Sequence, residues 1–198
     1  MDTFWKKAQI YEKNWHGNCI NTLFEEEKQL IYANRMGLER VGNEKTPYVF
    51  DLHGTSVIDI GGGDTSLLLK CVNFSKAVVV DPLNFPNWVI ARYSTAGIKF
   101  WNECGEDLET TEKFDICLLY NVLQHTQNPE KIIKNVRKVS KLIKIFEWID
   151  TSISEGHIHT LTEEKLNKWL SGEGKVEVFN QRPLFGKGYY GVFLGEVK

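Results

Sequence analysis

The amino-acid sequence predicts an α/β fold of three layers, in which a mostly parallel β-sheet carries helices on both faces and ends in an antiparallel pair of C-terminal strands. From residue 55 onward, short apolar runs alternate with helical patterns, as they do in βαβ units. A glycine turn at residues 61–63 directly follows the first apolar run. The chain has 198 residues, of which 42% are hydrophobic and 25% charged, so one domain with a full apolar core is expected.

Residues 1–50 are expected to form a helical, aromatic cap over a core of residues 51–198, and the two together make one domain of residues 1–198. Gly37 is a suitable end for a helix of this cap, and residues 43–47 have the composition of a turn. The apolar face of that helix is indicated by the spacing of Ile20, Leu23, Phe24, Glu27, Leu30 and Ile31.

The first half of the core contains four predicted strands. They cover residues 56–60, 77–81, 98–100 and 114–120. A helix that contains residues 67–69 follows the first strand. A second helix begins at Pro86, since proline suits the first turn, and ends at Gly97.

The second half begins with the clearest helix of the chain, which Asn128 caps and Pro129 starts. A fifth strand covers residues 142–149. Thr160 and Glu163 have the spacing of a capping box and open another helix, which the glycines at 172 and 174 end. Residues 175–179 and 189–197 are expected to be the final antiparallel strands, with residues 181–188 connecting them.

The glycine turn predicts a nucleotide-type cofactor site. Asp59 stands two residues before Gly61, Gly63 follows, and Asp81 ends the next strand. The NAD fingerprint G-x-G-x-x-G is incomplete, because Ser66 occupies its third glycine position. A carboxylate at Asp59 also disfavours a pyrophosphate and suits a cationic amino group.

These residues resemble the first motif of the class I S-adenosylmethionine-dependent methyltransferases, acid-x-Gly-x-Gly-x-Gly, except that Thr65 replaces the last glycine. The resemblance covers about residues 40–198. It implies a Rossmann-like fold, S-adenosyl-L-methionine as cofactor and S-adenosyl-L-homocysteine as product. It also implies that Asp81 holds the ribose hydroxyls and that an acid of residues 105–108 lies beside the adenine. The cofactor-binding residues expected on this basis are Asp59, Gly61, Gly62, Gly63, Asp81, Pro82, Glu106, Asp107, Asn121 and Tyr11.

Candidate catalytic bases follow the fourth and fifth strands, where an acceptor would approach. They are His125, Glu147, His157 and His159. His125 could instead be a structural histidine bonded to backbone. His157 and His159 lack a visible third ligand, so no metal is expected. Tyr11, Trp15 and His16 are expected to close over the cofactor's methionine end or the acceptor, although Trp5 and Trp15 could simply pack the helix onto the sheet.

The predicted function is transfer of a methyl group to an O or N atom of a small polar or carbohydrate-like acceptor. A net charge of −2 argues against a nucleic-acid partner. The alternatives are an RNA or protein methyltransferase that uses the basic face of residues 131–141, a non-catalytic binding subunit with a methyltransferase fold, and an NAD-dependent oxidoreductase. The cysteines have no CxxC spacing, and neither a signal peptide nor a membrane span is visible, so a cytoplasmic protein with reduced thiols is expected. The sequence carries no signal for an oligomeric state.

Overall fold

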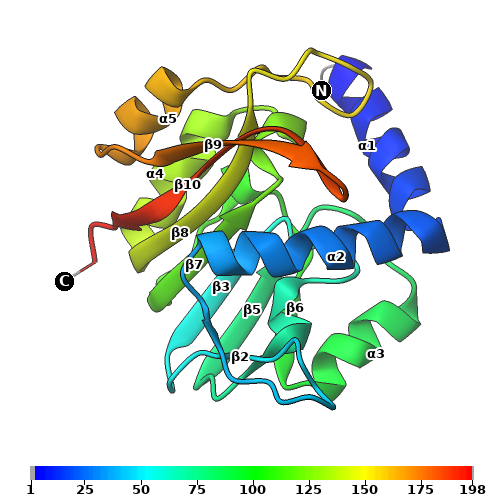
Figure 1. Ribbon diagram of the computed structural model, residues 1–198, viewed down its shortest axis with the longest axis vertical. Coiled ribbons are helices and arrows are strands. Elements are labelled where there is room, and N and C mark those ends of the chain that lie inside the picture. The colour runs from blue at the N-terminus through cyan, green and yellow to red at the C-terminus, as the bar shows by residue number, and fades with distance from the viewer. Residues whose placement is uncertain (1–2, 198) are drawn as a thin grey trace.

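The computed structural model describes residues 3–197 and contains a seven-stranded sheet in the order β6-β5-β3-β7-β8-β10-β9 (Figure 1). The strands from β6 to β8 are parallel, β10 is antiparallel to β8, and β9 is antiparallel to β10. Their bounds are Ser56–Ile60 for β3, Lys76–Val80 for β5, Ile98–Trp101 for β6, Phe114–Tyr120 for β7, Ser140–Ile149 for β8, Lys175–Gln181 for β9 and Leu184–Leu194 for β10. The predicted mostly parallel sheet with an antiparallel C-terminal pair is confirmed.

Helices cover both faces of the sheet. On one face lie α2 (Cys19–Arg35) and α3 (Asn87–Thr95), and on the other lie α4 (Pro129–Val139) and α5 (Glu163–Leu170) (Figure 1). Each face has its own buried apolar cluster, and successive strand residues alternate between them, as the pleat requires: Val57 belongs to the first and Ile58 to the second. The predicted C-terminal end of α3 is confirmed, since Gly97 follows this helix with a positive φ. The predicted start of α4 is also confirmed, since Asn128 caps it.

The helix predicted to contain residues 67–69 is wrong in length. Only a short 3-10 turn, η1 (Leu67–Lys70), follows the glycine turn, and β4 (Cys71–Val72) begins directly after it. The chain turns back early because β4 pairs with β2 (Phe50–Asp51), which also pairs with β1 (Glu39–Arg40) in a small second sheet. No pattern in the sequence indicated these two-residue strands.

The apolar face predicted for α2 is only partly correct: Leu30 and Ile31 pack against the core, but the apolar residues nearer the start of the helix do not. Ile20, Leu23 and Phe24 are 62%, 66% and 48% exposed. The buried face of α2 consists of Glu25, Gln29, Tyr32 and Ala33. This face is polar where it meets a loop, since the Gln29 side chain donates a hydrogen bond to the backbone oxygen of Thr65, and aromatic where it meets the sheet, since Tyr32 packs against Phe146 of β8. The helix ends where predicted, with Gly37 at φ +67° just beyond its cap.

Two boundaries in the C-terminal part differ from the prediction. Thr162, rather than Thr160, caps α5 by accepting a hydrogen bond from the backbone of Lys165, because the Thr160 hydroxyl donates to the backbone oxygen of Thr151. The segment 181–188, predicted as a connection, belongs mostly to β10, since its pairing with β9 continues down to Leu184 opposite Gln181. None of the helices within residues 3–197 combines the length and apolar character needed to cross a membrane.

Candidate functional site

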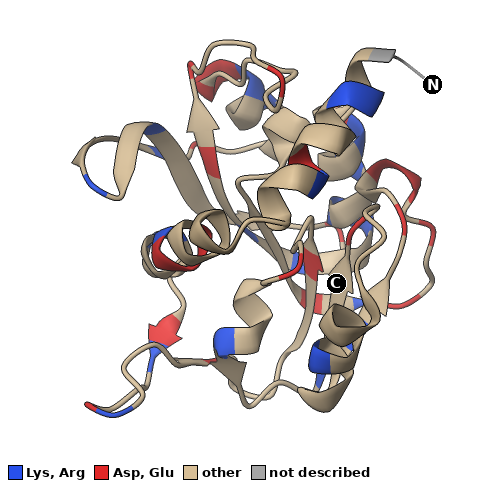
Figure 2. Cartoon of the chain, turned by 90° about the vertical axis from the view of Figure 1, so that its right-hand side faces the viewer, with Lys and Arg blue, Asp and Glu red and all other residues tan. Residues whose placement is uncertain are grey.

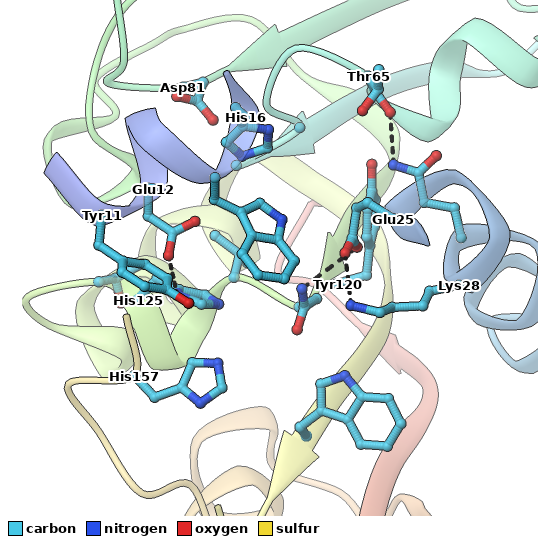
Figure 3. Close-up of a pocket in the computed structure, with 18 of the residues that line it drawn as sticks. Tyr11, Glu12, His16, Glu25, Lys28, Thr65, Asp81, Tyr120, His125 and His157 are labelled. Atoms are coloured by element: carbon cyan, nitrogen blue, oxygen red, sulfur yellow. Dashed lines mark hydrogen bonds and ion pairs between the residues drawn. The ribbon is translucent and has the colours of Figure 1, made fainter. Parts of the chain in front are cut away.

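A cavity lined by Gly61, Gly62 and Asp81, called the main cavity below, lies at the carboxyl edge of the parallel strands. It has a volume of about 480 Å³ and lies between this edge and the two N-terminal helices, α1 (Thr3–His16) and α2 (Figure 3). From the sheet side it is lined by Gly61, Gly62, Asp81, Pro82, Asn121 and His125. Cofactor sites of open α/β sheets occur at this edge, so the position is that of a ligand site.

The glycine turn approaches two other segments closely. Gly61 and Gly63 have φ of +73° and +65°, which glycine adopts without strain. A Cβ on Gly61 would lie 2.2 Å from Val122, and one on Gly63 would lie 2.8 Å from the ring of His16. The glycines therefore bring the turn into contact with the loop after β7 and with the end of α1.

Side-chain hydroxyls from other elements hold the rest of this turn. The Tyr93 hydroxyl of α3 accepts from the backbone of Ser66 and donates to the backbone oxygen of Gly63. The Tyr120 hydroxyl of β7 accepts from the backbone of Leu67. The turn is therefore bonded to α3 and β7 by side chains, in addition to its bond to Gln29 of α2.

Asp59 lies behind the turn and not in the cavity. It is fully buried, and its Oδ2 accepts hydrogen bonds from the hydroxyls of Ser66 and Tyr120 at 2.5 and 2.8 Å. Its Oδ1 has no hydrogen-bond partner among the described residues. Burial raises the pKa of Asp59 to about 7, against the lowering effect of the two hydroxyls. Asp59 therefore fixes the turn to β7.

Asp81 faces the cavity directly. Its side-chain oxygens accept hydrogen bonds from the backbone N–H groups of Gly63 and Leu83, at 3.0 and 2.9 Å. Burial outweighs these bonds and raises the pKa of Asp81 to about 6. A buried carboxylate that receives only backbone donors from the described chain can accept further hydrogen bonds, and a ligand with hydroxyl groups supplies them.

The acidic segment after β6 forms one end of the site. Glu106, in η2 (Gly105–Asp107), accepts hydrogen bonds from the backbone of Gln127 and Asn128 and lines a small cavity of about 30 Å³. Asp107 points to solvent and pairs with Lys131. The opposite wall of the small cavity is formed by Trp5 and Gln9, so α1 covers this end of the site as well.

Two of the predicted residues have different roles at the loop after β7: Asn121 belongs to this loop, and Glu147 of β8 holds its backbone. Asn121 has a φ of +49° and lines the main cavity, where its amide lies 3.5 Å from Glu25. Glu147 is fully buried and does not line this cavity; its Oε1 accepts from the backbone of Val122 and Leu123 at 3.0 Å each, and its Oε2 has no partner among the described residues. Burial raises the pKa of Glu147 to about 7.

Helix α1 is fastened over the cavity by contacts that lie far apart in the sequence. His16 donates to Asp64 at 2.8 Å, and Glu12 pairs with His125 at 3.0 Å. Burial alone would lower the pKa of His16, but the hydrogen bond and charge of Asp64 raise it above its usual value. Tyr11 packs against Gly156 of the loop after β8, which lies beside α1 in Figure 1.

The histidines after β8 occupy different positions. His157 is half-buried and lines the main cavity. His159 lies outside it, with Nε2 at 3.2 Å from the backbone oxygen of Gln127. No group of three or more His, Cys, Asp or Glu with a metal-ligand arrangement occurs in residues 3–197.

Sequence reasoning missed several polar residues of the cavity wall. Glu12 comes from α1, and Glu25 and Lys28 come from α2, where they pair with each other at 3.2 Å (Figure 3). The ammonium of Lys28 also lies 5.7 Å from the centre of the Trp15 ring. A usable signal existed: Glu25, Gln29, Tyr32 and Ala33 have the i, i+4, i+7, i+8 spacing of one helical face.

The basic face of residues 131–141 is partly neutralised by ion pairs. Lys131 and Arg137 of α4 pair with Asp107 and Glu196, and Lys141 near the start of β8 pairs with Asp115. Figure 2 shows Lys and Arg positions interspersed with Asp and Glu positions along the chain on the side it presents. Because their charges are paired, Lys131, Arg137 and Lys141 do not form a continuous basic surface of the kind that binds a nucleic-acid backbone.

Comparison with known proteins gives a family model and a set of similar folds. The model of the methionine biosynthesis protein MetW matches residues 48–148, just over half of the chain. No curated protein sequence matches the chain.

Among solved structures, the N-methyltransferase NodS from Bradyrhizobium japonicum WM9, in complex with S-adenosyl-L-homocysteine, has a TM-score of 0.67 at 13% identity and covers 96% of this chain and 98% of its own. The DhpI complex with the same ligand has a TM-score of 0.63 at 11% identity, with 97% of both chains covered. The 1,6-didemethyltoxoflavin-N1-methyltransferase of Burkholderia thailandensis has a TM-score of 0.56 at 13% identity over 72% of both chains. The fold is therefore that of the class I methyltransferases.

Proposed function

Because the chain belongs to the family of the methionine biosynthesis protein MetW and has the fold of class I methyltransferases, we propose that it is an S-adenosyl-L-methionine-dependent methyltransferase. The observation that carries the proposal is the main cavity, where the buried Asp81 and the glycine turn meet at the carboxyl edge of the sheet. We propose an O or N atom of a small polar or carbohydrate-like molecule as the acceptor.

The residues present fit this cofactor. Asp81 is a buried carboxylate open to further donors, which suits the two hydroxyls of a ribose. Gly61 and Gly62 line the cavity without side chains, so a ligand can approach their backbone closely. Pro82, Asn121 and Tyr11 complete the proposed cofactor wall; Glu106 and Asp107 belong to the proposed adenine end, and Gly63 and Asp59 support the turn.

The bound cofactor supplies a methyl group activated by a sulfonium. The protein has to hold the acceptor atom in line with the methyl carbon and to exclude water, which raises the rate without a further reactive group. Helix α1 serves the second purpose, since its contacts close the cavity from above. Of the candidate bases, His125 and His157 line the cavity and are proposed for the acceptor end. Glu147 is proposed to hold the Val122 backbone, and His159 to hold the loop after β8.

Two observations support a small acceptor. The cavity of about 480 Å³ lies beneath α1, and Trp15 and Trp148 form part of its wall, which suits a compact ring or sugar. Two of the solved relatives are named as N-methyltransferases, and one of them was solved with bound 1,6-didemethyltoxoflavin, a small molecule.

The test is calorimetric titration with S-adenosylmethionine and S-adenosylhomocysteine, with NADH in parallel. We expect both methionine-derived ligands to bind and NADH not to bind. Asp81→Ala should weaken binding about 10- to 100-fold, since a hydrogen bond to a charged group contributes roughly 1.5–3 kcal/mol. The control is Glu109→Ala, an exposed acid outside the cavity lining, which should leave affinity unchanged.

The other outcomes decide between the alternatives. Binding of NADH alone would overturn the methyltransferase proposal. Binding of none of the three ligands would favour a non-catalytic subunit with a methyltransferase fold. Binding of the expected ligands leads to a screen of small amines, hydroxylated aromatics, heterocycles and sugars for the production of S-adenosylhomocysteine.

A further inference from the structure

Three side chains from distant segments meet at the cavity wall opposite Asp81. Glu12 belongs to α1, His125 to η3 (Leu123–His125) after β7, and His157 to the loop after β8 (Figure 3). Glu12 Oε1 lies 3.0 Å from His125 Nδ1, and the ring centres of His125 and His157 lie 4.9 Å apart at an angle of 70°. The cluster exists only because α1 lies over the carboxyl edge of the sheet.

Both ring nitrogens of His125 have protein partners. Nδ1 faces Glu12 and also lies 2.8 Å from the backbone oxygen of Gly156, so this nitrogen carries a hydrogen. Nε2 lies 3.3 Å from the side-chain nitrogen of Gln124, which can donate to it when the imidazole is neutral and also donates to Asn121 Oδ1 at 3.0 Å. His125 is therefore held on both sides and has no nitrogen left for an incoming acceptor.

His157 is in the opposite situation. Its ring lines the main cavity and makes no hydrogen bond with any residue of the described chain. The position of the ring is fixed by its edge-on contact with His125 and by the loop, where the backbone N–H of His157 donates to Ser154. It is the member of the cluster that offers a free ring nitrogen to the cavity.

The charges around the cluster shift the pKa values of His125 and His157 in opposite directions. Glu12 faces His125, His16 and His157; His125 also faces Glu147. Burial alone would lower the pKa of His125, but Glu12 raises it above its usual value. Burial and the charge of His125 lower the pKa of His157 to about 4, against the raising effect of the Glu12 carboxylate, so His157 is neutral near pH 7.

We propose that Glu12 is a positioning residue of the methyl-transfer site, which acts through His125 to hold His157 as the proton acceptor for an O–H or N–H group of the methyl acceptor. The proposal rests on the proposed function. In the reaction, the acceptor O or N forms a bond to the methyl carbon, and the carbon–sulfur bond breaks with its electron pair going to sulfur. The acceptor proton moves to the free nitrogen of His157 and from there to solvent.

Under this proposal, α1 supplies one residue of the acceptor site, Glu12. Because Glu12 belongs to α1, its pairing with His125 depends on the placement of this helix over the cavity, whereas Asp81 and the glycine turn line the cavity from the sheet side.

The first experiment follows the histidine rings by NMR over pH 4 to 9, with the full chain saturated by S-adenosylhomocysteine. Glu12→Gln is expected to shift the titration of His125 to lower pH by about one unit, because the carboxylate that stabilises the imidazolium is gone. Glu27→Gln, an exposed carboxylate on α2, is the matched control and should shift neither ring. Affinity for S-adenosylhomocysteine should stay within about threefold of wild type in both variants.

The second experiment uses an acceptor identified in the screen. Glu12→Gln should lower kcat about tenfold or more at unchanged KM for S-adenosylmethionine and should alter the pH profile of kcat, whereas Glu12→Asp should restore part of kcat. His157→Gln should lose kcat to a similar or larger extent while the titration of His125 persists. This second variant tests the proposal independently of the folding of Glu12→Gln.

Unchanged titration of His125 and unchanged kcat in Glu12→Gln would overturn the role of Glu12, and full kcat in His157→Gln would overturn the role of His157. These outcomes differ from failure of the proposed function, in which the wild-type protein does not bind S-adenosylhomocysteine at all.

Discussion

Replacing Asp59 by asparagine should reduce the pH dependence of stability in a defined window. Asp59 is fully buried, and its pKa rises from 3.8 to about 7 on folding. Between these values the folded state binds more protons than the unfolded state, so the contribution of Asp59 to the free energy of unfolding falls as the pH rises.

The magnitude follows from the shift. At 1.36 kcal/mol per pKa unit, an ionised Asp59 costs the folded protein about 4 kcal/mol at pH 8, and roughly 1.4 kcal/mol of this cost develops between pH 6 and pH 8. Asp59→Asn has no titrating group at this position. Its free energy of unfolding should therefore decline between pH 6 and pH 8 by about 1.4 kcal/mol less than that of wild type.

Urea unfolding of the ligand-free protein at pH 6, 7 and 8 measures this difference. Wild type itself should lose stability over the window, because burial also raises the pKa values of Asp81 and Glu147, to about 6 and about 7. Asp115→Asn is the control: hydrogen bonds from Ser56 and the nearby Lys141 lower the pKa of Asp115 to about 2, so its titration is complete below pH 6. Parallel curves for wild type and Asp59→Asn would refute the assignment of a buried, titrating carboxyl group to Asp59.

Three further substitutions test the packing of the site by urea unfolding at pH 7. Gly61→Ala should destabilise the protein by more than Gly54→Ala. Both glycines have φ near +70°, but a Cβ at Gly61 would lie 2.2 Å from Val122, whereas one at Gly54 would meet nothing within 4 Å. Equal losses of unfolding free energy in the two variants would contradict this reasoning. Tyr120→Phe should cost about 2–4 kcal/mol, because two buried groups each lose a hydrogen bond, and a loss below about 1 kcal/mol would count against the hydroxyl network. Leu23→Gln should change stability by less than about 0.5 kcal/mol, since this side chain is mostly exposed; a loss above about 1.5 kcal/mol would show that it is covered.

The parts of the fold that could be predicted are those in which local signals and the core agree. The runs that became β3, β5 and β7 are apolar because both sheet faces are covered, and Asn128 with Pro129 begins α4 as predicted. Where tertiary contacts decided the structure, prediction failed. The 3-10 turn at Leu67 is short because β4 pairs with a strand some twenty residues earlier, which no local pattern reveals.

The candidate site also contains some residues that could be predicted from the sequence and some that could not. Gly61 and Asp81 could be placed at the cavity from the glycine turn and the strand ends alone, because parallel strands bring their carboxyl ends to one edge. Glu12 and Glu25 could not, since their position depends on how α1 and α2 pack across that edge. The apolar residues near the start of α2 suggested a face that is in fact exposed, because the part of the helix that covers a polar loop buries polar side chains such as Gln29.

The side chains that hold the glycine turn have a consequence for the thermodynamics of binding. Tyr93, Tyr120 and Gln29 fix the turn by hydrogen bonds that belong to the protein alone. The backbone entropy of these residues is therefore lost during folding, and a ligand that docks against the turn does not have to order it. Such preorganisation should appear in calorimetry as a smaller unfavourable entropy change on binding than a disordered turn would give.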